Sequence, residues 1–248
     1  MRFGPRSLNL ADPVDREAAW NPSNVWFPLP HTSGSTTLFD PVGRNHGTLT
    51  NGPTWGGEPD GRRAVRFDGS DDYATFAEVS GTAHTWAVRF LRERTGSYEE
   101  LVGHTSDNNR IGLSGFDASS ITVKSIHDNS TWDDAHVGSR GAWAWQTAVV
   151  AWVSGVSTQA TLNGVTLSKG SGQSGTSKWA RFGNGFQGSI QSAWYWPVAL
   201  SDSQAVVFCQ EADAGFPTLF RRVSPVSWFV GGGAVVNRRR RLITCAGG

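Results

Sequence analysis

Cysteine is scarce in this chain, which limits how the fold can be stabilised. Only Cys209 and Cys245 occur among 248 residues, and they form neither a C-x-x-C motif nor a disulfide framework. The sequence leaves open whether the two pair with each other. We therefore expect a hydrophobic core to hold the fold, and a chain of this length is long enough to bury one.

Long apolar runs are also lacking. No stretch approaches the roughly 20 consecutive apolar residues that a membrane-spanning helix needs. Residues 1–5, Met-Arg-Phe-Gly-Pro, do not begin an apolar stretch of the kind found in secretory signal peptides. The sequence therefore predicts neither a membrane span nor a secretory signal, and a protein that stays where it is made until something else carries it out.

Glycine and large aromatic residues, in contrast, are plentiful. The chain has 30 Gly, 12 Trp and 13 Phe, and only 17% of its residues are charged. This composition suits a sheet protein with many tight turns and an aromatic core. Short strand patterns separated by turn signals about every ten residues favour a sandwich over βαβ units. Asn163-Gly164, between two such patterns, predicts a tight hairpin.

The most informative stretch is residues 67–73, Phe-Asp-Gly-Ser-Asp-Asp-Tyr. Residues 62–67 alternate polar and apolar side chains, as a half-buried strand does, and the aspartates and Gly69 then supply turn chemistry. Strand patterns resume at residues 73–76 and 85–90.

This arrangement resembles the laminin-G-like, concanavalin A-like jelly roll, in which an apolar-Phe-Asp-Gly turn and an Asp-Tyr pair precede a Trp-bearing strand. The opening at residues 40–49, Asp-Pro-Val-Gly-Arg-Asn-His-Gly-Thr-Leu, is similar to the family's Asp-x-x-Gly-x-Asn-x-Gly-x-Leu. Residues 181–196 resemble its last core strand, and residues 199–202, Ala-Leu-Ser-Asp, resemble its helix start. Ser201 and Gln204 have the spacing of a helix capping box.

The resemblance implies an all-β, antiparallel jelly-roll β-sandwich with one short helix near the C-terminal end of the domain and extended terminal arms. We expect an N-terminal arm at residues 1–23, the jelly roll at 24–220 and a basic C-terminal extension at 221–248.

Catalytic motifs are missing. The related jelly-roll glucanases carry Glu-x-Asp-x-x-Glu on one strand, because retaining hydrolysis needs a close acid and nucleophile. Here Glu58-Pro59-Asp60 is followed at the third step by Arg63, and Glu211-Ala212-Asp213 by Phe216. No G-x-S-x-G, H-E-x-x-H or phosphate-binding loop is present either. The sequence predicts a protein that is not an enzyme.

Family members often hold a structural calcium ion near these loops, and the resemblance places Asp68, Asp71 and Asp72 at that position. Carboxylates are ligands that Ca²⁺ prefers. The chain departs from the family at Gln191-Ser192, where two acids are common. The alternative is that the three aspartates only form the turn.

A second polar cluster spans residues 127–136, and its His, Asp and Trp side chains suit either a metal ion or a sugar. Trp could stack on a sugar ring while acids bind its hydroxyl groups, or the stretch could be a solvated loop at a strand end. The candidate ligand-contacting residues are His127, Asp128, Trp132, Asp133, Asp134 and His136.

We expect most tryptophans to be core residues, because Trp86, Trp152 and Trp194 fall within strand patterns. Trp143 and Trp145, two positions apart, should face the same way, either into the core or in an exposed patch. The core is favoured.

Charge is unevenly distributed along the chain. Net charge is +1, but residues 221–248 contain six arginines and no acid, leaving −5 on the remainder. These arginines predict contacts with an acidic partner surface; nucleic acid is disfavoured because no aromatic residues are interleaved. The arginines are Arg221, Arg222, Arg238, Arg239, Arg240 and Arg241.

Two classes of function remain. The layout of arm, jelly roll and basic tail is similar to that of bacteriophage virion proteins, such as capsid decoration or tail-associated proteins. Such a protein would be made in the host cytoplasm, reside in the virion, contact other copies and other virion proteins, and display a lectin-like sandwich to surface glycans. The alternative is a free carbohydrate-binding module or a glycan-processing protein of the glycoside hydrolase type. Fold alone does not decide between them.

Overall fold

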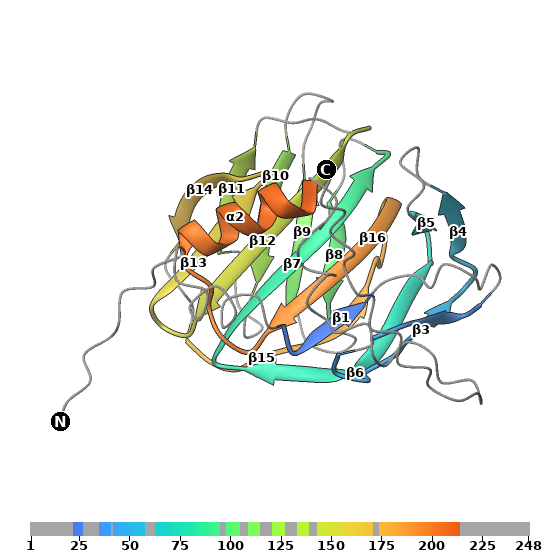
Figure 1. Ribbon diagram of the computed structural model, residues 1–248, viewed down its shortest axis with the longest axis horizontal. Helices are drawn as coiled ribbons and strands as arrows, with labels where there is room; N and C mark the ends of the chain where they lie inside the picture. Colours follow the sequence, from blue (N-terminus) through green and yellow to red (C-terminus); the bar gives the residue numbers. More distant parts are fainter. Residues whose placement is uncertain are drawn as a thin grey trace, which may run out of the picture.

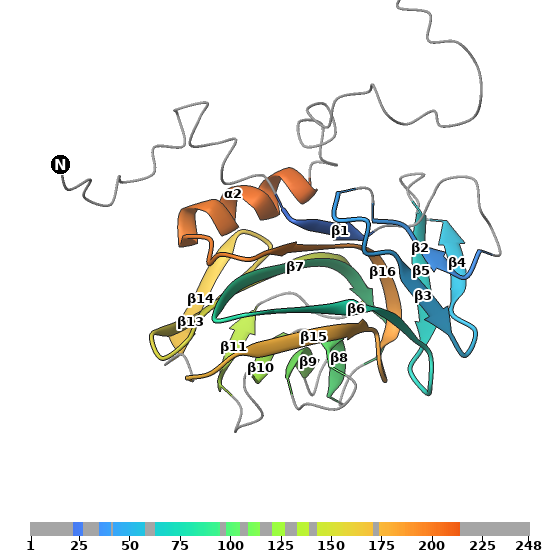
Figure 2. The same ribbon diagram turned by 90° about the horizontal axis from the view of Figure 1, so that it is seen from below.

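The described part of the chain forms two facing antiparallel β-sheets with one helix outside them (Figures 1 and 2). The computed structural model describes residues 22–26, 35–40, 42–57, 63–94, 98–104, 109–114, 121–126, 133–138, 143–170 and 174–213. Together these observations confirm the predicted all-β sandwich with one helix near its C-terminal end. Residues 1–21 of the predicted N-terminal arm (1–23) and the whole predicted extension at 221–248 lie outside the described residues, so the domain boundaries stay predictions.

We call the sheet that packs against the helix the front sheet. Its strand order is β14-β13-β12-β7-β16-β5-β4, and β1 pairs with the C-terminal part of β16, at Ala193 to Tyr195. Its strands are β1 (Asn24–Trp26), β4 (Thr54–Gly57), β5 (Arg63–Asp68), β7 (Ala83–Arg92), β12 (Trp145–Val153), β13 (Ser157–Leu162), β14 (Val165–Gly170) and β16 (Gln187–Trp196).

The other sheet, the back sheet, has the order β11-β10-β9-β8-β15-β6-β3-β2. Its strands are β2 (Thr37–Leu38), β3 (Gly47–Thr50), β6 (Tyr73–Gly81), β8 (Glu99–Gly103), β9 (Arg110–Ser114), β10 (Ile121–Ile126), β11 (Asp133–Gly138) and β15 (Ser177–Phe182). Neighbours in space are often distant in sequence, as in a jelly roll.

An aromatic core fills the space between the sheets. Trp26 of β1 stacks on Trp86 of β7 with ring centroids 5.5 Å apart, and Phe76 of β6 meets Phe182 of β15 at 4.5 Å. Large rings at such spacings contribute packing energy beyond the area they bury. The prediction that most tryptophans are core residues is confirmed for Trp26, Trp86, Trp152, Trp179, Trp194 and Trp196, each 3% exposed or less.

A second apolar layer joins the helix α2 (Asp202–Asp213) to the outer face of the front sheet. Phe208 meets both Trp194 and Trp196 edge-on, with ring centroids 5.1 and 5.2 Å away. The capping box is confirmed, because the Ser201 N–H donates to Gln204 Oε1 at 2.7 Å and the Gln204 N–H to Ser201 Oγ at 3.4 Å. No helix in the described residues is long and apolar enough to cross a membrane.

The Asp40 carboxylate explains the opening motif. Asp40 is completely buried and accepts hydrogen bonds from four backbone N–H groups and from the Asn24 side chain, all at 2.8–3.1 Å. The side-chain amide of Asn45 binds the backbone of Ala77 in β6: Asn45 Nδ2 donates to the Ala77 carbonyl at 2.7 Å, and the Ala77 N–H donates to Asn45 Oδ1 at 2.8 Å. The Asp and Asn of the motif thus fix the chain reversal that precedes β3. The N–H donors to Asp40 belong to Val25, Val42, Gly43 and Asn45.

Candidate functional site

The Asp-rich turn joins β5 to β6 at one end of the sandwich. The Ser70 N–H donates to Asp68 Oδ1 at 2.7 Å, and the Asp68 N–H donates to Asp72 Oδ2 at 2.9 Å. Gly69 has a φ of 83°, and a Cβ there would lie 2.7 Å from the Cβ of Gln187. Both the left-handed backbone and the close neighbour therefore require glycine at this position.

The three aspartates of this turn converge. One carboxylate oxygen each from Asp68, Asp71 and Asp72 lie within 4.8 Å of one another. Because Ca²⁺ binds oxygen at about 2.3–2.6 Å, ligands on opposite sides of one ion are separated by about that distance. Burial, followed by the charges of Asp68 and Asp71, raises the pKa of Asp72 above its ordinary value. The residues present fit a divalent cation, which would offset this crowding of negative charge.

Gln191 and Ser192 do not lie at this turn. The residue of β16 that pairs with Asp68 is Gln187, four positions before Gln191 and so about 13 Å away along the strand. The pairing register of β16 with β5 therefore separates Gln191 and Ser192 from the aspartate cluster.

The polar cluster at residues 127–136 is only partly described. His127, Asp128 and Trp132 lie outside the described residues. Asp133, Asp134 and His136 belong to β11, whose backbone pairs His136 with Val123 and Asp133 with Ser125. These three residues are therefore in a strand at one end of the back-sheet order and not in a loop. The basic residues proposed as partner contacts, Arg221, Arg222, Arg238, Arg239, Arg240 and Arg241, also lie outside the described residues.

Trp143 is the largest departure from expectation. Its side chain is 67% exposed, and its φ is 71°, a left-handed value that costs a non-glycine residue roughly 1–2 kcal/mol. Its N–H donates to the carbonyl of Arg92 at 2.8 Å, which holds it at the end of β7. The prediction of a core position was wrong. The spacing of two residues between Trp143 and Trp145 predicted that both rings face the same way. Whether Trp145 faces the core or the outer side of the front sheet is set by the register of β12 with β7.

Trp145 begins a row of side chains across the outer face of the front sheet. Residues directly opposite each other in neighbouring strands point to the same face. Trp145 pairs with Leu91, Leu91 with Ser189, and Ser189 with Arg66. Trp145 and Leu91 are half-buried, and Arg66 is exposed.

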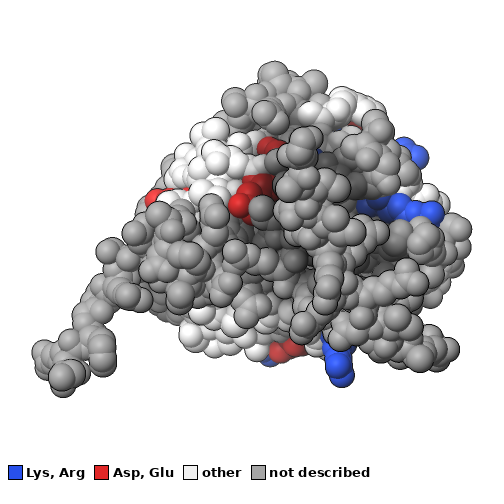
Figure 3. Space-filling view, in the orientation of Figure 1, with Lys and Arg blue, Asp and Glu red and all other residues white. Residues whose placement is uncertain are grey.

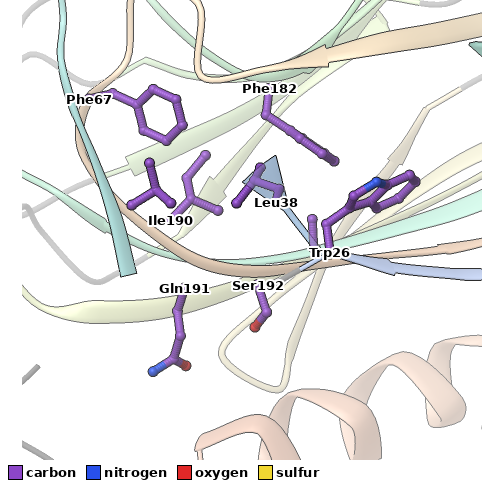
Figure 4. A pocket seen from close by; sticks show the side chains of 9 residues that line it. Trp26, Leu38, Phe67, Phe182, Ile190, Gln191 and Ser192 are labelled. Carbon is purple, nitrogen blue, oxygen red and sulfur yellow. The ribbon is translucent and has the colours of Figure 1, made fainter. Parts of the chain in front are cut away.

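A β-bulge in β16 lies next to this row. Ile190 pairs with Phe90 and Ser192 with Arg89, so that Gln191 is the extra residue. In Figure 4 the side chains of Gln191 and Ser192 project from the same side of β16, away from Phe67 and Ile190 in the core. The bulge therefore directs two consecutive polar side chains to the outer face.

Arg89 connects the bulge with Trp145 and α2. Its guanidinium lies 5.8 Å from the Trp145 ring centroid, and its Nη1 lies 2.6 Å from Asp213 Oδ1 at the end of α2. Two buried donors here, Arg89 Nε and Gln191 Nε2, have no hydrogen-bond partner among the described residues. Figure 3 shows the molecule in the orientation of Figure 1. Basic side chains are visible toward β5 and acidic ones over α2.

Other charged residues are held in buried or mostly buried pairs. Glu99 is fully buried against Arg92, and its Oε1 accepts the Gln187 N–H at 2.9 Å. On β8, Glu100 binds Arg181 through both carboxylate oxygens at 2.9 and 3.2 Å, and burial raises its pKa. These carboxylates serve the packing of β7, β8 and β15.

Solved structures of other proteins share this two-sheet β-sandwich fold. Domain 4 of AbnA, a GH43 extracellular arabinanase from Geobacillus stearothermophilus solved with arabinotriose, superposes with a TM-score of 0.59 and 17% identity. The match covers 77% of this chain and 98% of that domain. The chain thus shares the two-sheet β-sandwich fold of that domain.

Longer proteins carry the same fold. The binding domain of botulinum neurotoxin DC, solved with SialylT, matches with a TM-score of 0.58 and 10% identity over 77% of this chain and 51% of that one. Trypanosoma rangeli sialidase matches with a TM-score of 0.52 and 10% identity over 77% of this chain and 33% of the sialidase. This chain thus spans about half and a third of these two proteins. No family model and no curated protein sequence matches the chain.

Proposed function

We propose that this chain is a non-catalytic glycan-binding sandwich that serves as a structural or adhesive subunit of a bacteriophage virion. The observation that carries the glycan-binding part is the correspondence with almost the whole of the arabinanase domain, 98% of its length, in a structure that holds arabinotriose. The match is to an accessory-sized sandwich rather than to a fragment of a larger unit, so the likeness concerns a complete domain of that enzyme.

The virion part of the proposal is supported by the sequence alone. The basic extension, with six arginines and no acid in residues 221–248, suits an acidic surface on a neighbouring virion protein or another copy. A sandwich anchored through this extension would expose the part of its surface that does not contact the particle. That part could bind glycans on a cell surface. The protein would then be made in the host cytoplasm and reside in the virion.

Two experiments test these parts separately. The full chain on an array of neutral and acidic oligosaccharides should bind at least one class, and binding to none contradicts glycan recognition. For assembly, solution mass by light scattering should show multimers of the full chain and a monomer for residues 24–220. If both chains are monomers, the arms do not assemble copies of this protein.

Calcium at Asp68, Asp71 and Asp72 belongs to the same proposal. The three carboxylates would hold the ion and thereby fix the β5–β6 turn. We expect millimolar Ca²⁺ to raise the melting temperature of the full chain by a few degrees, because a ligand that binds only the folded state stabilises it. Asp71→Asn should abolish the increase. If Ca²⁺ raises the melting temperature of the variant as much as that of the parent, or does not raise that of the parent, the aspartates only form the turn.

A glycan-processing enzyme is the second candidate, and the aspartate cluster is what favours it. Retaining glycosidases use two carboxyl groups about 5–5.5 Å apart, one of them with a raised pKa. Asp72 has a raised pKa and lies within 4.8 Å of its partners. The Asp72 carboxylate, however, accepts the Asp68 N–H within the turn, which suits a structural role better. Release of reducing sugar from arabinan by the full chain, lost in Asp72→Asn, would establish the enzyme.

A further inference from the structure

We infer that the outer face of the front sheet, around Trp143, Trp145, Arg89 and Gln191, is a binding site for a neutral oligosaccharide. This inference rests on the proposed glycan-binding function and specifies its place and its ligand. Four features lie in this part of the front sheet: a strained exposed tryptophan whose backbone N–H donates to Arg92 at the end of β7, a second indole in register with the sheet, a bulge, and buried donors without a partner among the described residues.

Trp143 supplies the stacking surface. An indole presents a flat apolar face with one polar N–H at its edge, which complements the C–H face of a sugar ring. The side chain is 67% exposed although the other described tryptophans of the strands are mostly core residues. Its backbone is also held at a φ of 71°, where glycine would be unstrained. Neither feature stabilises the fold, and strained residues of this kind cluster at ligand sites.

Trp145 and Arg89 extend the surface toward the bulge. Trp145 heads the row formed with Leu91 and Ser189, and the Arg89 guanidinium lies 5.8 Å from its ring centroid. A half-buried indole beside a guanidinium, with a serine hydroxyl two strands away in the same row, combines an apolar surface with hydrogen-bonding groups. This mixture is typical of small-ligand sites, in which a few placed polar groups fix orientation.

The bulge supplies unpaired donors. Arg89 is 5% exposed and Gln191 6%, yet Arg89 Nε and Gln191 Nε2 have no hydrogen-bond partner among the described residues. A buried donor without a partner is costly, so sites that leave one open usually complete it with water or a ligand. Sugar hydroxyl oxygens are acceptors of the required kind.

Charge pairing on this face favours a neutral sugar over an acidic one. Arg66 Nη2 lies 2.6 Å from Glu93 Oε2, and Arg89 Nη1 lies 2.6 Å from Asp213 Oδ1. Each arginine is thus already neutralised by an acid. A sialic or uronic acid carboxylate would meet both cations with their counter-charges in place. A neutral hydroxyl, in contrast, can accept from Arg89 and donate to Asp213.

The experiment compares three full-length proteins on one array of neutral and acidic oligosaccharides that includes arabinotriose and sialyllactose. They are the parent chain, Trp143→Gly and the control Val156→Ala. Val156 is equally exposed, at 68%, but lies in the β12–β13 turn at the other end of β12. Trp143→Gly removes the ring and relieves the backbone, so it should fold at least as well as the parent, as measured by melting temperature.

We expect the parent and Val156→Ala to bind neutral glycans equally and Trp143→Gly to bind them at least tenfold more weakly. If glycans bind but Trp143→Gly matches the parent, the site is elsewhere and the proposed function stands. If only acidic glycans bind, the ligand class is wrong. If no glycan binds, this inference and the proposed glycan binding fail together. Gln191→Leu, which keeps the size of the side chain, should also weaken binding severalfold with the melting temperature held within a few degrees.

Discussion

Asp213, the last residue of α2, lies 2.6 Å from Arg89 in β7, a residue 124 positions earlier in the chain. The Arg89 side chain is 6% exposed, so its charge depends on this carboxylate and on Thr147 Oγ1, at 3.2 Å. The pair therefore ties the end of the helix to the outer face of the front sheet.

Removing this carboxylate should loosen α2. We expect Asp213→Ala to lower the free energy of unfolding by about 1–3 kcal/mol, because the buried Arg89 charge loses its partner. Asp213→Asn keeps an acceptor oxygen and should cost less. Urea denaturation followed by tryptophan fluorescence measures both. If Asp213→Ala is as stable as the parent, Arg89 does not depend on the helix.

The two glutamates Glu100 and Glu93 form a matched test of burial. Glu100 has a 3% exposed side chain and binds Arg181 with two hydrogen bonds, whereas Glu93 binds Arg66, whose side chain is 56% exposed. Glu100→Gln should cost about 1–3 kcal/mol, because the mostly buried Arg181 loses two charge-assisted hydrogen bonds, and Glu93→Gln less than about 1 kcal/mol. Equal losses in urea denaturation would mean that burial does not set the strength of these pairs.

The buried Asp40 should be indispensable to the fold. Asp40→Ala leaves five N–H donors without their acceptor, and we expect a loss of about 3–5 kcal/mol in the free energy of unfolding. Asp71→Ala, an exposed aspartate, serves as the control and should change stability by less than about 0.5 kcal/mol in calcium-free buffer. Thermal and urea denaturation should agree. A small effect at Asp40 would show that water replaces the carboxylate.

His84 should make the fold sensitive to acid. Its ring is fully buried, 5.1 Å from Trp152 and 5.2 Å from Trp179 between centroids, and burial lowers its pKa from 6.5 to about 3. Between these two values the unfolded chain binds a proton that the folded chain does not. Stability from this group is therefore complete above pH 6.5 and is lost as the pH falls toward 3.

A variant without the titrating group tests this expectation. His84→Asn should be less stable at pH 7, because it leaves a gap among the rings, but its stability should fall less steeply between pH 6.5 and 4. Urea denaturation at several pH values gives both slopes. Parallel slopes would assign the acid sensitivity to other groups.

The local features of the fold were predictable because short-range chemistry encodes them. Asn163 and Gly164 have φ values of 51° and 80°, which confirms the predicted hairpin turn between β13 and β14. Ser201 and Gln204 cap α2 as their spacing predicted. The aspartates of residues 68–72 converge because only a four-residue turn separates β5 from β6.

Which side chains meet across strands was decided only by the tertiary structure. The sequence by itself determined the alternating strands, the turns, the helix start and the aromatic composition of the core, all of which follow from neighbours within a few residues. The exposure of Trp143, the distance of Gln191 from Asp68 and the pairing of Arg89 with Asp213 depend on strand register and on one bulge in β16. A shift of one residue in register turns a side chain to the opposite face, and register is set by partners far away in the chain.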